Sequence, residues 1–276
     1  MNYVYIGAEK TSTTYLQRLF NSNKPLFAET AGISYLSSPS MAKSIVAAAR
    51  KGTPKVGLPE HFRPAPDRNL LISEFFYRDL NTPGYIAGLK PILDAMMPGE
   101  YKVVLYVRDQ TDWIVSFYST YIKRGGVLPF EKYLDFVMRK KRSLDFGGFA
   151  GHWADVFGSA LEVHHYKGGT VLGDVLGRFG TRPEDVPFED PGQANVSLPV
   201  ESMEILRQAN RAMGRLPESD DKEELRKALK NTMTSHAFGS EKLRATPEQR
   251  ARIEAFYAKS NAALNDRWGT ALPVPG

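Results

Sequence analysis

Short apolar runs alternate with longer segments of helical periodicity between residues 3 and 179, and this alternation restricts the fold more than any other feature. Buried strands are predicted where apolar residues stand together, at residues 3–6, 70–73, 102–107 and 161–166. Helical spacing is found at residues 11–21, 41–50, 82–97, 113–122, 130–139 and 171–179. Strands that alternate with helices form a parallel sheet covered on both faces, so we expect an α/β fold.

The C-terminal part of the chain has a different pattern. Helices alone are predicted there, at about residues 199–213, 221–233 and 247–268. A chain of 276 residues is long enough for one large domain. We therefore expect a single domain over 1–276, with an α/β core over 1–190, a mainly helical part over 191–270 and a frayed tail over 271–276.

Composition narrows the class of protein. The chain has no cysteine, so it forms no disulfide and no cysteine-based metal site. We find neither a secretory signal nor an apolar run long enough to cross a membrane, and we expect a soluble, cytoplasmic protein without membrane insertion. The net charge of +5 suits an anionic ligand or nucleic acid. No aromatic-rich basic motif or zinc-finger spacing supports nucleic-acid binding, and the basic run 139–142 is interpreted as a solvated helix end.

The turn after the first predicted strand has the composition of an anion site. Residues 7–14 read Gly-Ala-Glu-Lys-Thr-Ser-Thr-Thr. Ligands of parallel sheets bind beyond the carboxyl ends of the strands, and the N-terminus of the following helix offers unpaired N–H groups to an anion. Lys10 adds a positive charge. The spacing is not that of a Walker A motif, because the lysine comes three residues after Gly7. The alternative is a hydroxyl-rich helix cap beside a solvated lysine.

A second candidate anion site follows the most apolar strand. Arg108 comes directly after this strand, and Ser116 lies near the start of the next helix. An arginine fork with a hydroxyl can hold a phosphate. The alternative is that Arg108 pairs with Asp109 or Asp112 and that Ser116 has no role.

Together these two segments resemble the sulfotransferases that use 3′-phosphoadenosine-5′-phosphosulfate, in particular the bacterial members that act on carbohydrates. Residues 5–17 are similar to the family's 5′-phosphosulfate loop, and residues 107–118 to its 3′-phosphate motif. Residues 153–166 and 195–210 are similar to later segments of bacterial members. The chain departs from the pattern at Ser12, where glycine is usual, and at Gln110, where proline is usual.

The resemblance implies a P-loop-like fold of three layers and a set of ligand contacts. Gly7, Lys10, Thr11, Ser12, Thr13 and Thr14 would hold the 5′-phosphosulfate, and Arg108 and Ser116 the 3′-phosphate. The loop 235–244 would close over the nucleotide with Lys242 and Arg244, whose alternative interpretation is plain surface charge. The donor would be 3′-phosphoadenosine-5′-phosphosulfate, the product adenosine 3′,5′-bisphosphate, and no metal is expected.

Transfer to a hydroxyl needs a base, and Glu74 is the candidate. It follows the second predicted strand, at the same sheet edge as the first turn. In carbohydrate-acting branches a glutamate at this place is the proposed base; Lys10 would stabilise the leaving phosphate. The alternative is that Glu74 only pairs with Lys10 or Arg78. His61, in the proline-rich segment 51–69, is a candidate for binding the acceptor, while His164 or His165 is expected to be a satisfied core histidine.

The sequence thus predicts sulfuryl transfer to a hydroxyl on a small molecule, a carbohydrate or a glycolipid. Two alternatives remain open at this point. One is an ATP-dependent, kinase-like P-loop transferase in which Asp109 holds a metal. The other is a non-catalytic nucleic-acid-binding domain that uses the basic excess.

Overall fold

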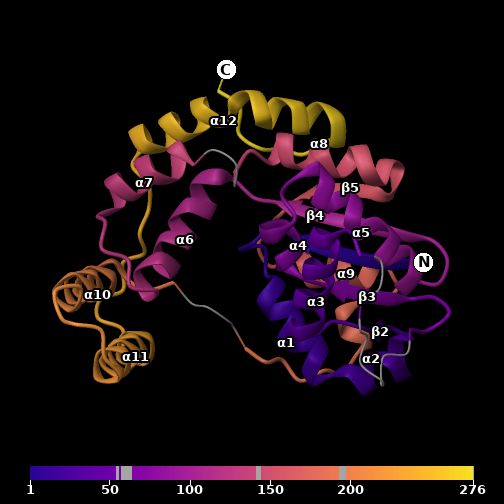
Figure 1. Ribbon diagram of the computed structural model, residues 1–276, viewed down its shortest axis with the longest axis horizontal. Helices are drawn as coiled ribbons and strands as arrows, with labels where there is room; N and C mark the ends of the chain where they lie inside the picture. Colours follow the sequence, from indigo (N-terminus) through magenta and orange to yellow (C-terminus); the bar gives the residue numbers. More distant parts are fainter. Residues whose placement is uncertain (54–55, 57–63, 141–143, 193–196, 276) are drawn as a thin grey trace. The chain divides into compact units, whose positions relative to one another are not determined.

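In a computed structural model of the chain, the structure describes residues 1–53, 56, 64–140, 144–192 and 197–275. A five-stranded sheet of order β2-β3-β1-β4-β5 organises it, and all its neighbouring strands are parallel (Figure 1). The strands are β1 (Asn2–Gly7), β2 (Ser34–Tyr35), β3 (Asn69–Ile72), β4 (Tyr101–Val107) and β5 (Leu161–His165). Helices flank the sheet, so the α/β class is confirmed.

Four of these strands were predicted, and β2 was not. β2 has only two residues, too few for an apolar pattern. Its place is set by pairing with β3, where Ser34 lies opposite Asn69 and Tyr35 opposite Leu70. A short edge strand of this kind depends on tertiary contacts that local sequence does not report.

One face of the sheet carries an aromatic core. Alternate strand residues point to this face, among them Tyr5, Ile72 and Tyr106, and all three are buried. They pack against α1 (Thr13–Ser22), α2 (Lys24–Ala31) and α9 (Val171–Gly177). The first turn therefore leads from a central buried strand into a helix that is fixed on this face.

The intervening strand residues, such as Val4, Leu71 and Leu105, are also fully buried, because other helices cover the sheet there. These helices are α3 (Pro39–Lys51), α4 (Glu74–Asp79), α5 (Pro83–Met96) and α8 (Phe146–Phe157). α8 was not predicted, since its three glycines weaken helix propensity by about 1 kcal/mol each. Asp145 caps its start by accepting from the Gly148 N–H at 3.0 Å, and Trp153 is fully buried.

The described chain separates into two compact units. Unit 1 comprises Met1–Arg108, Asp145–Ala194 and Lys259–Pro273, and it contains the sheet. Unit 2 comprises Asp109–Leu144, Asn195–Ala258 and Val274–Gly276. The sequence predicted a border between the α/β core and the helical part at residue 190. The division into units differs from it, because α6 (Gln110–Lys123) and α7 (Phe130–Arg139) group with later helices. These are α10 (Val200–Met213), α11 (Asp220–Ser235) and the first part of α12 (Pro247–Trp268), whereas the 3₁₀ turns Gly158–Ala160 and Pro183–Asp185 lie in unit 1.

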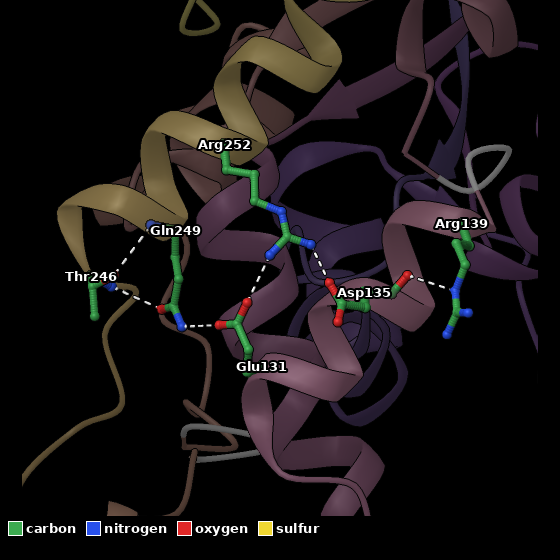
Figure 2. A network of polar contacts seen from close by, with 6 residues as sticks. All are labelled: Glu131, Asp135, Arg139, Thr246, Gln249 and Arg252. Atoms are coloured by element: carbon green, nitrogen blue, oxygen red, sulfur yellow. Dashed lines mark hydrogen bonds and ion pairs between the residues drawn. The ribbon is translucent and has the colours of Figure 1, made fainter.

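Within unit 2, polar contacts join α7 to the start of α12 (Figure 2). Arg252 donates to Glu131 at 2.7 Å and also pairs with Asp135. Gln249 donates to Glu131 at 2.6 Å and forms a capping box with Thr246, in which each side chain accepts a hydrogen bond from the other residue's backbone N–H. Arg252 thus faces two carboxylates, whereas Arg139 donates to the Asp135 backbone carbonyl at 3.3 Å.

The C-terminal tail is not frayed over the residues where fraying was expected. Leu272 is buried, and its N–H and carbonyl bond the Asn265 side chain at 3.0 and 2.9 Å. Asn261 donates to the Pro273 carbonyl at 2.8 Å. The prediction of a frayed tail was therefore wrong for Leu272 and Pro273, because two asparagines on α12 hold their backbone. No helix among the described residues is both long and apolar enough to cross a membrane.

Candidate functional site

The turn between β1 and α1 is built around a close approach at Gly7. This residue has φ +121°, and a Cβ there would lie 2.8 Å from the Cβ of Tyr77 on α4. Only glycine fits such a conformation next to another side chain. The end of β1 is thereby held against α4, the short helix that begins with Glu74.

The residues before α1 adopt left-handed backbone conformations. Lys10 has φ +66° and Ser12, the N-cap, has φ +64°. The first backbone bond of the helix is donated by Leu16 to the Ser12 carbonyl at 3.0 Å. The N–H groups of the first turn, including those of Thr13 and Thr14, therefore have no partner within the helix and carry its positive dipole end.

The four hydroxyl residues of this turn are not equivalent. Thr11 is buried and donates its hydroxyl proton to the Ala8 carbonyl at 2.6 Å, so this side chain holds the turn together. Ser12 is half-buried, and its hydroxyl lies 2.8 Å from the Tyr166 hydroxyl. Thr13 is buried and Thr14 is half-buried at the start of α1. The turn is thus bonded from within by Thr11 and contacted from outside by Tyr166.

Arg108 lies against the same turn. Its guanidinium donates to the Lys10 carbonyl at 3.1 Å and lies over the Tyr166 ring, 5.5 Å from the ring centroid. Tyr166 in turn contacts Ser12. The structure therefore brings Arg108, the arginine of the second predicted anion segment, to the first turn within unit 1, at the carboxyl ends of β1 and β4.

The carboxylates next to Arg108 in the sequence have other partners. Asp109 caps α6 by accepting from the Asp112 N–H at 3.0 Å. Both aspartates pair with Arg250, at 3.3 and 3.4 Å, within unit 2. The structure shows no ion pair between Arg108 and any other residue that it describes. Both aspartates thus have Arg250 as a partner, a residue that the sequence did not suggest.

Glu74 begins α4 directly after β3, where Ser73 caps the helix and donates its N–H to the Tyr5 carbonyl at 2.9 Å. The Gln17 amide donates to the Glu74 carboxylate at 2.8 Å and to the Ile72 carbonyl at 3.2 Å. α1 and β3 together therefore position the carboxylate.

Arg78 was the second predicted partner of Glu74. It instead makes a two-bond contact with Asp79, at 3.0 and 2.7 Å. The contact with Asp79 raises the pKa of Arg78, and the negative charges of Glu9 and Glu74 add to this. Glu74 is thus held by an amide in the described structure, and Arg78 is held by its sequence neighbour.

Sequence reasoning missed the roles of Gln17 and Tyr166. Both lie within the segments that carry the family resemblance, but neither is charged, so no rule on charge selected them. The signal for Gln17 was its position one helical turn beyond Thr13, on the helix that the anion site begins.

The other predicted site residues lie elsewhere. Ser116 is half-buried on α6 in unit 2. Lys242 and Arg244 are exposed in unit 2, where Lys242 forms a backbone bridge with Pro199. His61 falls outside the described residues. His164, one of the two histidines of which one was expected to be a satisfied core residue, is half-buried and has its Nε2 2.6 Å from the Arg178 guanidinium.

Comparison with known proteins adds no assignment. No family model matches the chain, and no curated protein is significantly similar to it.

Proposed function

We propose that this chain is a sulfotransferase that moves a sulfuryl group from 3′-phosphoadenosine-5′-phosphosulfate to an acceptor hydroxyl. The observation that carries the proposal is the hydrogen bond from Arg108 to the Lys10 carbonyl. It brings an arginine without a carboxylate partner among the described residues to a turn that already offers a lysine and a helix N-terminus. Such a cluster suits a ligand with several anionic groups.

Different residues would bind the two anionic ends of the donor. The turn 7–14 would bind the 5′-phosphosulfate through the N-terminal N–H groups of α1 and through Lys10. Arg108 would bind the 3′-phosphate, joined by Ser116, Lys242 and Arg244 if unit 2 contributes to the nucleotide site. The proposal includes a P-loop-like arrangement, in which the anion turn follows the central strand β1 of the sheet.

The reaction is an in-line displacement. The acceptor oxygen forms a bond to sulfur while the bond between sulfur and the 5′-phosphate oxygen breaks. The hydroxyl proton passes to Glu74, and the electron pair of the broken bond leaves with adenosine 3′,5′-bisphosphate. Lys10 and the dipole of α1 stabilise the charge that develops on the departing oxygen, and the step as written needs no metal.

The acceptor is proposed to be a hydroxyl of a carbohydrate or glycolipid, and the enzyme to act in the cytoplasm without nucleic acid. Glu74 supports this class of acceptor, since alcohols of sugars hold their proton firmly and need a carboxylate close by. The kinase-like alternative asks Asp109 to hold a metal. This carboxylate already caps α6 and pairs with Arg250, which weighs against it.

A ligand comparison tests the proposal. Thermal unfolding is measured with adenosine 3′,5′-bisphosphate, with AMP, and with ATP and Mg²⁺. A ligand at 100 times its dissociation constant stabilises the folded protein by about 2.7 kcal/mol. We expect the bisphosphate to raise the Tm most and radiolabelled sulfuryl groups to pass from the donor to a glycoside. A larger shift with ATP and Mg²⁺ would contradict the proposal.

A further inference from the structure

A small cavity lies beside Glu74. It has a volume of about 60 Å³ and is formed by α1, by the segment from the end of β2 to the first turn of α3, and by the start of α4. The lining residues that matter here are Gln17, Asn21, Tyr35, Ser37, Glu74 and Phe75. A single water needs roughly 10–15 Å³ of such space, so the cavity has room for a few heavy atoms but not for a sugar ring.

Tyr35 places a polar atom against this cavity. The residue is 6% exposed, and its hydroxyl makes no hydrogen bond of normal geometry with any residue that the structure describes. The neighbouring Ser37 hydroxyl gives its proton to the Ile72 carbonyl at 2.7 Å. Burial raises the pKa of Tyr35; Ser37 opposes the rise and the charge of Glu74 adds to it. The phenol thus keeps its proton and can donate it in a hydrogen bond to a ligand in the cavity.

Glu74 supplies the complementary group. Gln17 bonds one of its two carboxylate oxygens, Oε2. A carboxylate accepts several hydrogen bonds, whereas the protonated phenol of Tyr35 donates one. An alcohol placed between these two side chains can donate a hydrogen bond to Glu74 and accept one from Tyr35. Phe75 offers the apolar surface that a carbon next to this alcohol needs.

We propose that this cavity binds a hydroxymethyl group, so that the acceptor is a primary alcohol and Tyr35 selects it. This inference rests on the proposed function and deepens it. A secondary ring hydroxyl carries ring carbons on both sides and does not fit the volume. A hydroxymethyl group brings one carbon and one oxygen, which fit the space and bond both Tyr35 and Glu74.

Binding of two glycosides tests the proposal without any turnover. The probes are methyl α-D-glucopyranoside, which has a hydroxymethyl group, and its 6-deoxy counterpart, which has a methyl group there. Dissociation constants come from NMR titration of the full chain. We expect the first probe to bind about tenfold more tightly, and Tyr35→Phe to remove this preference. Tyr3→Phe is the control, because the Tyr3 hydroxyl donates to the Arg178 carbonyl and does not line the cavity.

A second variant guards against misfolding of Tyr35→Phe. Asn21 is exposed at the rim, so Asn21→Phe narrows the cavity without entering the core. It should weaken binding of the hydroxymethyl glycoside about tenfold, whereas Ser22→Phe, also exposed but outside the lining, should not. Equal binding of the two probes to the wild type, or no change in Asn21→Phe, would overturn the proposal.

The position of the transferred group separates this inference from the proposed function. With the donor present, sulfation of the primary hydroxyl supports both, and sulfation of a ring hydroxyl overturns the cavity assignment alone. If adenosine 3′,5′-bisphosphate gives no thermal shift while the glycoside preference holds, the proposed function is overturned and the hydroxymethyl site stands.

Discussion

Arg108 at the sheet edge of unit 1 and Arg252 in unit 2 show two different uses of the same side chain. Arg252 contacts two carboxylates, Glu131 and Asp135, and its side chain is 41% exposed (Figure 2). Arg108 contacts a carbonyl and an aromatic ring. The charge of Arg252 is cancelled locally, whereas that of Arg108 is not cancelled by any residue that the structure describes. A cation held in place without a counter-charge is prepared to bind an anion.

The acidic side chains repeat this contrast. Glu131 accepts from Arg252 and Gln249, and exposed pairs of this kind contribute little to stability. Glu74 is held by the neutral amide of Gln17. An amide orients a carboxylate by hydrogen bonding and carries no charge of its own. The charged side chains at the sheet edge of unit 1 can therefore act on a ligand, whereas those of unit 2 pair with one another.

The largest expected effect comes from removing the proposed base. Glu74→Gln should lower the rate of sulfuryl transfer about 10²- to 10⁴-fold, because the amide cannot take the proton. The thermal shift with adenosine 3′,5′-bisphosphate should remain. Glu131→Gln is the matched change in unit 2 and should leave the rate unaltered. Unchanged turnover in Glu74→Gln would rule out this base.

Next in size is Gly7→Ala. The added Cβ meets the Tyr77 Cβ at 2.8 Å, and the positive φ is unfavourable for alanine. We expect unfolding in urea to show a loss of about 3 kcal/mol, since overpacking and strain add. Gly52 has φ +64°, and no atom lies within 4 Å of a Cβ added there. Gly52→Ala should therefore lower the free energy of unfolding by only about 1 kcal/mol. Equal losses would show that the close approach at the turn has no energetic weight.

Arg108→Ala should weaken binding of adenosine 3′,5′-bisphosphate about 10- to 100-fold by calorimetry, because a hydrogen-bonded charge pair is lost. The affinity of Arg108→Lys should lie between those of the wild type and Arg108→Ala, because lysine keeps the charge but lacks the planar guanidinium. Arg252→Ala serves as the control for charge alone. If all three variants bind equally, Arg108 is not a ligand.

The smallest effect is expected on stability in unit 2. Arg252→Ala should lower the free energy of unfolding by at most about 1 kcal/mol, since its partners are exposed. In 1 M salt the difference should vanish, because ions screen surface charges. A loss that persists in salt would mean that the side chain stabilises through packing of its stem.

Local pattern predicted much of this fold. The α7 boundaries, Phe130–Arg139, agree with the helix predicted from spacing, because apolar residues there recur on one face. α8 was not predicted, because its glycines weaken the helical pattern. β2 was not predicted, because its two residues form a strand only through pairing with β3. Tail residues such as Leu272 are fixed by distant asparagines, which no local rule registers.

The candidate site could be predicted only in part from the sequence. The ends of parallel strands meet at one edge, so Lys10 and Arg108 could be placed together from their positions alone. The partner of Asp109 and Asp112 could not, since Arg250 lies far along the chain. Sequence neighbours pointed to Arg108 as the partner, and the fold provides Arg250.

A crystal structure with adenosine 3′,5′-bisphosphate tests the central claim most directly. The account predicts one nucleotide bound at the sheet edge, with one phosphate on the turn 7–14 near Lys10 and the other within hydrogen-bond distance of the Arg108 guanidinium. A nucleotide that contacts only one of these two residues, or that binds away from this edge, would contradict it.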